Sequence, residues 1–172
     1  MRTLSILRHA KSSWDNPGLD DHERPLARRG LRDAARIGGF IRDSALVPDL
    51  VLCSDAVRAR ATLTLVLAEI ATAPPRIVLD DALYLAEPSL LVARIASIEP
   101  ATRHAMVVGH NPGLHALALA LSGTGERELL ATLAAKLPTA GLAVLDLDIE
   151  AWAEIGPGRG RLRAFVTPKG LG

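Results

Sequence analysis

Four short apolar runs, separated by longer segments of helical or loop character, are the feature that most constrains this chain. They occupy residues 3–7, 50–53, 76–79 and 105–108. Each run is too short for a buried helix, and its aliphatic composition is typical of a strand buried on both faces of a sheet. Such strands need helices on both faces of the sheet, so the alternation predicts an α/β protein.

Helices are expected between these strands. Residues 26–44 carry apolar side chains at helical spacing. Ser54 is of the residue type that caps a helix, and we expect one over residues 56–71. Further helices are expected at residues 89–98 and 112–121, while residues 123–128 form either a loop or the start of another short helix that reaches Ala135.

The last part of the chain predicts a β-hairpin. Residues 142–149 and 162–166 alternate apolar and other side chains, and the turn sequence GPGRG lies between them at 156–160. Together with the earlier strands, they predict a three-layer αβα sandwich with a mostly parallel central sheet. No repeat, low-complexity tract or linker divides the sequence, so we expect one domain over residues 1–172.

Composition excludes several classes of protein. The 172 residues include 20 Lys and Arg against 19 Asp and Glu, a balance that argues against nucleic-acid or membrane partners recruited by bulk charge. Cys53 is the only cysteine, so no internal disulfide forms and a reducing compartment is indicated. No signal-peptide pattern and no apolar run of about 20 residues is present, which favours a cytoplasmic location.

Charged side chains stand where the predicted strands end. Arg8 and His9 follow the first strand, Arg58 lies just beyond the second, and His110 follows the fourth. Ligands bind at the carboxyl ends of the strands in open parallel sheets, so we expect these four side chains to share one cleft. Guanidinium groups match the oxygens of phosphate, and they also attract sulfate and carboxylate.

Histidine adds the possibility of covalent catalysis. An imidazole nitrogen without a proton attacks phosphorus, while the other ring nitrogen donates to a backbone carbonyl and thereby fixes the tautomer. Surrounding cations stabilise the charge that develops on the phosphoryl oxygens in the transition state. Lys11 and Ser12, in the first loop, are further candidates to reach a phosphate.

Several motifs resemble those of the histidine phosphatase superfamily, and more closely its small phosphohistidine phosphatase (SixA-type) branch. Four segments carry the resemblance: Leu7-Arg8-His9-Ala10, Arg24-Pro25-Leu26 with Arg29-Gly30, Ser54 to Thr62 (SDAVRARAT), and Val108-Gly109-His110-Asn111-Pro112. Their order along the chain matches the family, and the resemblance extends from about Leu4 to Thr167.

The resemblance implies a phosphoglycerate mutase-like fold and residue roles. It makes His9 the phosphoryl acceptor, places Arg8, Arg58 and His110 around the phosphate, and implies no metal and no cofactor. In an Asp80–Tyr84 segment similar to the Glu-x-Leu-Tyr pattern of larger relatives, Asp81 takes the position of the general acid. An Asp side chain is a poor proton donor near neutral pH because its reference pKa is about 3.9.

Three functions remain open at this point. The first is a metal-independent phosphatase that acts on a phosphohistidine side chain of a signalling protein. The second keeps the mechanism and takes a small phosphomonoester as substrate. The third is a catalytically silent module that binds phosphate on partner proteins, and the presence of Arg8, His9, Arg58 and His110 speaks against it.

Overall fold

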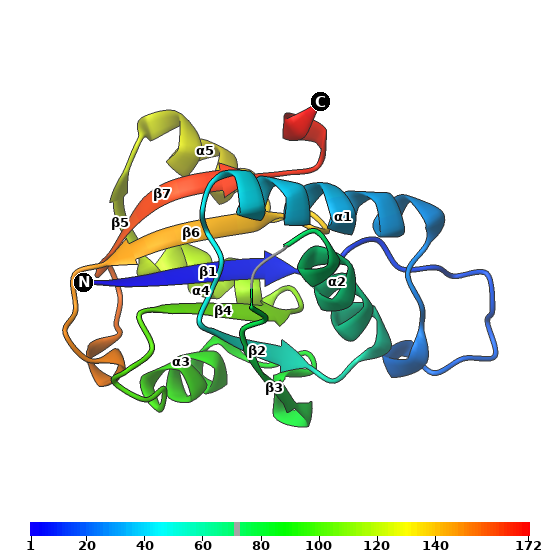
Figure 1. Cartoon of the computed structure of the whole chain (residues 1–172), viewed down its shortest axis with the longest axis horizontal. Coiled ribbons are helices and arrows are strands. Elements are labelled where there is room, and N and C mark those ends of the chain that lie inside the picture. Colours follow the sequence, from blue (N-terminus) through cyan, green and yellow to red (C-terminus); the bar gives the residue numbers. More distant parts are fainter. Residues whose placement is uncertain (71–72) are drawn as a thin grey trace.

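The computed structural model describes residues 1–70 and 73–172, which fold around one mixed sheet (Figure 1). The strands are β1 (Arg2–Arg8), β2 (Leu50–Ser54), β3 (Arg76–Asp80), β4 (His104–Gly109), β5 (Ser122–Gly125), β6 (Leu142–Leu147) and β7 (Gly160–Val166). The α-helices are α1 (Arg28–Asp43), α2 (Val57–Ala68), α3 (Pro88–Ala96), α4 (Gly113–Leu121) and α5 (Arg127–Ala135). All four apolar runs predicted to be strands are strands.

The sheet has the strand order β3-β2-β4-β1-β6-β7-β5. β3, β2, β4 and β1 pair in parallel, whereas β6 runs antiparallel to both of its neighbours. In the β1–β4 register Arg8 lies opposite Gly109, so the carboxyl ends of these two strands are level. The residues that follow each strand therefore emerge side by side at one edge of the sheet.

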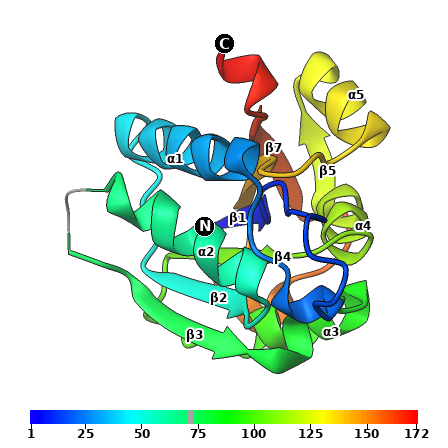
Figure 2. The same ribbon diagram turned by 90° about the vertical axis from the view of Figure 1, so that its right-hand side faces the viewer.

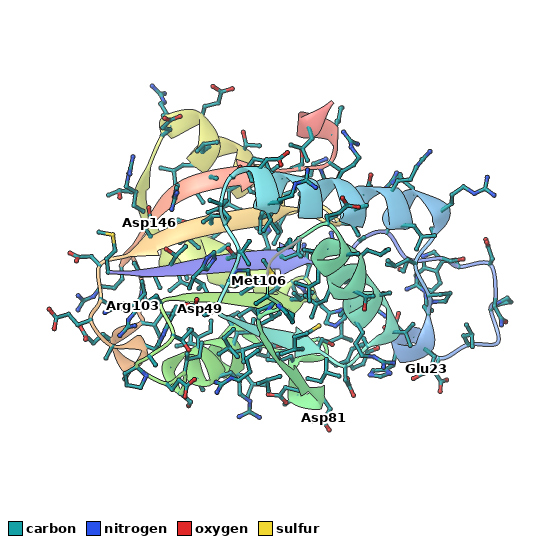
Figure 3. The ribbon with its side chains drawn as sticks, viewed as in Figure 1. Glu23, Asp49, Asp81, Arg103, Met106 and Asp146 are labelled. Carbon is teal, nitrogen blue, oxygen red and sulfur yellow. The ribbon has the colours of Figure 1, made fainter. Side chains whose placement is uncertain are left out.

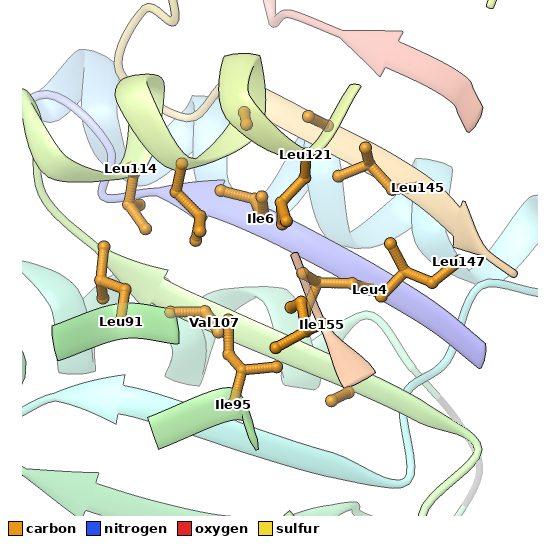
Figure 4. Close-up of a cluster of buried hydrophobic side chains, with 14 of the residues drawn as sticks. Leu4, Ile6, Leu91, Ile95, Val107, Leu114, Leu121, Leu145, Leu147 and Ile155 are labelled. Carbon is orange, nitrogen blue, oxygen red and sulfur yellow. The ribbon is translucent and has the colours of Figure 1, made fainter. Parts of the chain in front are cut away.

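Helices cover the sheet on both sides, which confirms the predicted αβα sandwich. Figure 2 shows α1 and α2 on one face and α3, α4 and α5 on the other. Each interface is filled by its own aliphatic cluster. In the cluster of Figure 4, Leu4, Ile6 and Val107 on the strands meet Leu114 and Ile95 on the helices. Burying such side chains stabilises the fold by roughly 1.5–3 kcal/mol each, which holds the strand ends in fixed positions.

At residues 123–128, the alternative of a short helix that reaches Ala135 is confirmed from Arg127 onward, but the residues before it form a strand that neither alternative predicted. Residues Ser122–Gly125 form the edge strand β5, parallel to β7, and the helix that reaches Ala135 begins only at Arg127. A glycine-rich strand carries no alternation of apolar side chains, so the pattern did not reveal it. Its backbone lies very close to a neighbouring loop: a Cβ on Gly123 would stand 2.1 Å from the carbonyl oxygen of Gly158.

The predicted hairpin is confirmed in its pairing and wrong in its connection. β6 and β7 are antiparallel neighbours. However, β7 already begins at Gly160, and the connecting segment includes a 3-10 helix at Trp152–Glu154 rather than a turn alone. Trp152 is buried and its indole N–H donates to the carbonyl of Thr102 at 2.9 Å. The predicted helix 56–71 ends at Ala68, and its last expected residue lies outside the described residues.

No helix within residues 1–70 and 73–172 has both the length and the apolar character that crossing a membrane requires.

Candidate active site

A cavity of about 230 Å³ opens at the carboxyl ends of β1, β2 and β4. Its lining residues are Arg8, His9, Lys11, Ser12, Trp14, Arg24, Arg58, Leu85, His110, Asn111 and Thr139. The four side chains predicted to meet at the strand ends are all among them, as are the two loop residues. His9, Arg58 and His110 are nearly buried, with exposed fractions of 7%, 4% and 3%.

His9 is held in one orientation by bonds to both ring nitrogens. Its Nδ1 lies 2.8 Å from the carbonyl oxygen of Ala10, which can only accept a hydrogen bond, so the hydrogen is assigned to Nδ1. Its Nε2 accepts from Nε of Arg58 at 3.4 Å. Burial, together with the positive charges of Arg58, Arg8 and Arg24, lowers the pKa of His9 to about 4. The ring is therefore neutral near pH 7, with the lone pair on Nε2.

Thr62 fixes the backbone around His9 to helix α2. Its hydroxyl accepts from the backbone N–H of Ala10 at 2.9 Å and donates to the carbonyl of Arg58 at 2.7 Å. The N–H of His9 itself donates to Gly109 at 3.0 Å, as a continuation of the β1–β4 pairing. Thr62 belongs to a motif visible in the sequence, but only the structure shows that its side chain connects the backbone of Ala10 to that of Arg58.

His110 faces His9 across the cavity, with ring centroids 5.2 Å apart. Its Nε2 lies 2.8 Å from the hydroxyl of Ser54, which also accepts from the N–H of Ala56 at 3.2 Å. When Ser54 donates to Nε2, the proton of His110 lies on Nδ1, and this N–H is available to donate to a ligand. Burial, followed by the neighbouring His9 and Arg58, lowers the pKa of His110 to about 3.

Buried polar atoms without partners concentrate in this cavity. Among the residues that the structure describes, Nε of Arg8, Nδ1 of His110 and Oδ1 of Asn111 have no hydrogen-bond partner. The other side of Arg8 is occupied, because its Nη1 donates to the carbonyl of Leu137 at 3.1 Å. Unsatisfied buried polar groups are rare and costly in native proteins. Arg8 and His110 both line the cavity, so their unpartnered nitrogens suit a ligand that presents acceptor oxygens.

Asp21 organises the arginines and was missed in the sequence. Arg58 donates to its carbonyl oxygen at 2.6 Å and to its Oδ2 at 2.9 Å, and Arg24 donates to its Oδ1 at 3.0 Å. The hydroxyl of Tyr84 also donates to Oδ2. These bonds, that of Tyr84 first, hold the pKa of Asp21 well below its usual range. The sequence signal that could have found it is the spacing of Asp21 and Arg24, three positions apart, which allows an ion pair between them.

The loop before α1 supplies the outer wall of the cavity. Arg24 donates to the hydroxyl of Ser12 at 2.7 Å and to the carbonyl of Ser13 at 3.0 Å. Its guanidinium carbon lies 3.1 Å from the ring centroid of Trp14, whose own exposed fraction is 70%. The hydroxyl of Ser12 is therefore engaged with Arg24, while Lys11 lines the cavity beside His9.

Asp81, expected as a general acid, is not brought to the cavity. It lies in the 3-10 helix Asp81–Leu83, is exposed, and is absent from the lining residues (Figure 3). Its neighbour Asp80 is used structurally, since it accepts from the N–H of Ala82 at 2.9 Å and from Arg94 at 2.6 Å. The lining residues of the described cavity include no Asp and no Glu.

His104, His115 and the cysteine have structural surroundings. His104 bonds the hydroxyl of Ser5 at 2.8 Å, and His115 bonds the carbonyl of Leu133 at 2.7 Å. Cys53 is buried, and burial raises the pKa of its thiol to about 12. Within the described residues, no three His, Cys, Asp or Glu side chains are grouped in a way that could hold a metal ion.

Comparisons with known proteins agree with this arrangement. The model of the histidine phosphatase superfamily (branch 1) matches residues 4–84. An uncharacterized protein of Mycobacterium tuberculosis is 39% identical over 166 residues, which cover 95% of this chain and all of the relative. The chain belongs to the histidine phosphatase superfamily. Its enzyme class is accordingly that of a phosphatase.

Solved structures of this superfamily superpose over nearly the whole chain. One from Agrobacterium tumefaciens, assigned as the phosphohistidine phosphatase SixA, is 34% identical with a TM-score of 0.82, covering 97% of this chain and 98% of its own. Another SixA-assigned protein, from Nakamurella multipartitia, is 27% identical with a TM-score of 0.83, covering 97% of this chain and 96% of its own. These similarities agree with the phosphoglycerate mutase-like fold expected from the motifs.

Proposed function

We propose that this histidine phosphatase hydrolyses phosphohistidine on a protein, without a metal ion, through a phosphoryl group carried transiently by His9. The observation that carries the proposal is the pairing of a neutral imidazole with unpartnered donors in one cavity. His9, whose Nε2 carries the lone pair and accepts from Arg58 at 3.4 Å, lines the same 230 Å³ cavity as Arg8 and His110, each of which has a buried ring or guanidinium nitrogen without a partner. A tetrahedral phosphoryl group requires both a nucleophile and donors of this kind.

The first step transfers the phosphoryl group to His9. Nε2 of His9 forms a bond to phosphorus, the phosphorus–nitrogen bond of the substrate breaks, and the released imidazole of the substrate takes a proton from water. Nδ1–H of His9 stays on the carbonyl of Ala10, which stabilises the positive charge the ring acquires. The guanidinium groups of Arg8 and Arg58 offset the negative charge on the transferred oxygens, and the neutral ring of His110 donates a hydrogen bond to them.

The second step returns the enzyme to its starting state. Water attacks the phosphorus on His9, the bond to Nε2 breaks, and inorganic phosphate leaves with the water oxygen. Because burial, and after it the neighbouring arginines, lower the pKa of His9 to about 4, the ring is released as neutral imidazole, ready for the next cycle. Burial and the arginines that bind the substrate therefore also make the histidine a good leaving group.

The lack of a carboxyl group among the described lining residues favours phosphohistidine over an alkyl phosphate. An alkoxide leaving group needs a proton donor with a pKa near the working pH. Asp81 lies outside the cavity, and Asp21 is held in its charged form by Tyr84 and two arginines. When phosphohistidine is cleaved, the leaving group is the imidazole of the substrate, which takes its proton from water and needs no enzymatic acid. The SixA assignment of the Agrobacterium relative supports the same substrate.

Turnover with and without His9 tests the proposal. With EDTA present, the wild-type protein is expected to hydrolyse a phosphohistidine peptide and an aryl phosphate, whose phenolate is also a good leaving group. Substitution His9→Ala should lower kcat by about 10³-fold or more, since the nucleophile acts as part of a unit. His115→Gln is the matched control, because His115 lies outside the cavity and should leave turnover unchanged.

Three outcomes would contradict the proposal. Activity that appears only with added divalent metal would exclude the metal-independent mechanism. Hydrolysis of small alkyl phosphates in preference to the phosphohistidine peptide would point to a small phosphomonoester as substrate. Binding of phosphate with no turnover of any phosphorylated compound would indicate the non-catalytic module.

A further inference from the structure

A second hollow, of about 820 Å³, runs beside the catalytic cavity and is lined by positive side chains. It is flanked by α1, by residues 132–139 at the end of α5 and in the segment that follows it, and by residues 165–169 at the end of β7 (α1, α5 and the C-terminal segment are visible together in Figure 2). We name it the α1 groove. Its basic lining residues are Arg29, Arg32, Arg36, Lys136 and Lys169. Asp33 is the one acid among the described lining residues, and it lies 3.8 Å from Arg29.

The arginines form a row along one side of the α1 groove. Arg29, Arg32 and Arg36 are spaced by three and four residues, so they project from the same face of α1. Seven residues of helix span about 10 Å, which is the length of about three residues of extended chain. Lys136 and Lys169 stand on the other walls. Arg36 also donates to the carbonyl of Gly172 at 2.5 Å. A short extended segment in the groove would meet the charges of Arg32, Lys136 and Lys169 along its length.

The α1 groove adjoins the catalytic cavity. Thr139 lines both hollows. The loop that carries it is attached to the catalytic residues, because the carbonyl of Leu137 accepts from Arg8 and from Asn111. At the other wall, the first turn of α1 touches the backbone that follows His9: a Cβ on Gly30 would stand 2.1 Å from the carbonyl oxygen of Lys11. A chain whose modified histidine occupies the cavity can therefore continue into the groove.

The floor of the α1 groove is largely apolar. Phe165, Pro138, Pro168 and Ala135 contribute to its lining between the basic side chains. A free inorganic anion would leave these surfaces unused, whereas a peptide that combines acidic and apolar side chains would contact both. Apolar walls with a few placed charges are typical of sites that bind organic ligands rather than bare ions.

We infer that the α1 groove docks an acidic, partly apolar segment of the phosphoprotein substrate, adjacent to its phosphohistidine. The inference rests on the proposed function, since it takes the substrate to be a protein. Complementary charge at such a site gives specificity and faster association. An aryl phosphate is small enough for the 230 Å³ cavity and does not reach the groove, so it reports on the chemistry alone.

Charge reversal in the α1 groove separates docking from chemistry. Two phosphohistidine peptides are compared, one flanked by Asp, Glu and Leu and the other by Asn, Gln and Leu. Wild type is expected to prefer the acidic peptide by about tenfold in kcat/KM. The double variant R32E/R36E should lose this preference and keep its activity on the aryl phosphate. The control R28E/R161E makes the same change in net charge at exposed arginines outside the groove and should retain the preference.

A binding measurement tests the α1 groove independently of turnover. Fluorescence anisotropy of the labelled, unphosphorylated acidic peptide should show binding to wild type that R32E/R36E weakens by about tenfold. Equal hydrolysis of both peptides by wild type, or an equal loss of the preference in the two double variants, would contradict docking in the α1 groove. The proposed function would not be affected by either result. Binding of the acidic peptide without any phosphatase activity would contradict the proposed function and would still support docking in the α1 groove.

Discussion

Asp21 shows how a residue outside the reacting groups sets their geometry. Arg58 has three nitrogens, of which two are committed to Asp21 and the third, Nε, lies on His9. The carboxylate also holds Arg24, and Tyr84 donates to it from the other side. Asp21 is thus a positioning residue, since it contacts the arginines rather than the nucleophile. Its negative charge also offsets part of the cationic charge of the cavity.

Substitution Asp21→Asn tests this role at the residue scale. The amide loses the charge and one of the acceptor oxygens, so Arg58 and Arg24 are expected to turn away from their positions. Misplacement of a catalytic group by about 1 Å costs about a hundredfold in rate, and we expect kcat on the aryl phosphate to fall between 10- and 100-fold. Asp81→Asn is the matched control and should change kcat less than twofold. Equal effects of the two substitutions would contradict the assignment.

At the scale of elements, the position of α1 depends on a glycine. Gly30 lies where α1 meets the loop after His9, with the carbonyl oxygen of Lys11 in the place a Cβ would take. Gly30→Ala forces these backbones apart, so we expect a loss of about 1–3 kcal/mol in the free energy of unfolding, together with lower kcat. Urea unfolding followed by circular dichroism measures the first quantity.

The control for Gly30 lies nine residues further along the same helix. A Cβ on Gly39 would meet only the end of the Arg42 side chain, at 3.7 Å. Gly39→Ala is therefore expected to stabilise α1 by about 0.5–1 kcal/mol through helix propensity. Stabilisation by both substitutions would show that the contact between α1 and the loop is not as tight as the structure describes.

Elements with a strong pattern were predictable from the sequence, and elements held by tertiary contacts were not. The run at 50–53 and the helical spacing of 26–44 each located an element to within two residues. The strand β5 was not predicted, because its residues pair with β7 without contributing apolar side chains. The meeting of Arg8, Arg58 and His110 followed from the rule for parallel strands. The hydrogen bonds of Asp21 could not be predicted in this way, because Asp21 and Arg58 lie 37 positions apart and no periodicity connects them.

For the whole molecule, the buried histidines tie stability to pH. Burial is the largest cause that lowers the pKa of His9 and His104 to about 4 and that of His110 to about 3. Between pH 6.5 and 4 the unfolded chain binds protons at these positions that the folded chain does not bind. The free energy of unfolding therefore decreases as the pH falls through this interval. Asp21 acts below this window, because its lowered pKa adds stability that is lost only below about pH 4.

Unfolding by urea at a series of pH values checks this expectation. A shift from 6.5 to about 4 corresponds to at most about 3 kcal/mol for one histidine. His104→Gln keeps a group able to bond Ser5 and removes one titration, so the decline between pH 6.5 and 4 should become shallower. His22→Gln should leave the decline intact, because its neighbours Asp55 and Glu23 raise the pKa of His22 and its stabilisation is lost as pH rises. A profile that stays flat from pH 6.5 to 4 in the wild type would mean that the folded protein takes up protons at these histidines as readily as the unfolded chain does, which would contradict the lowered pKa of His9 and His104.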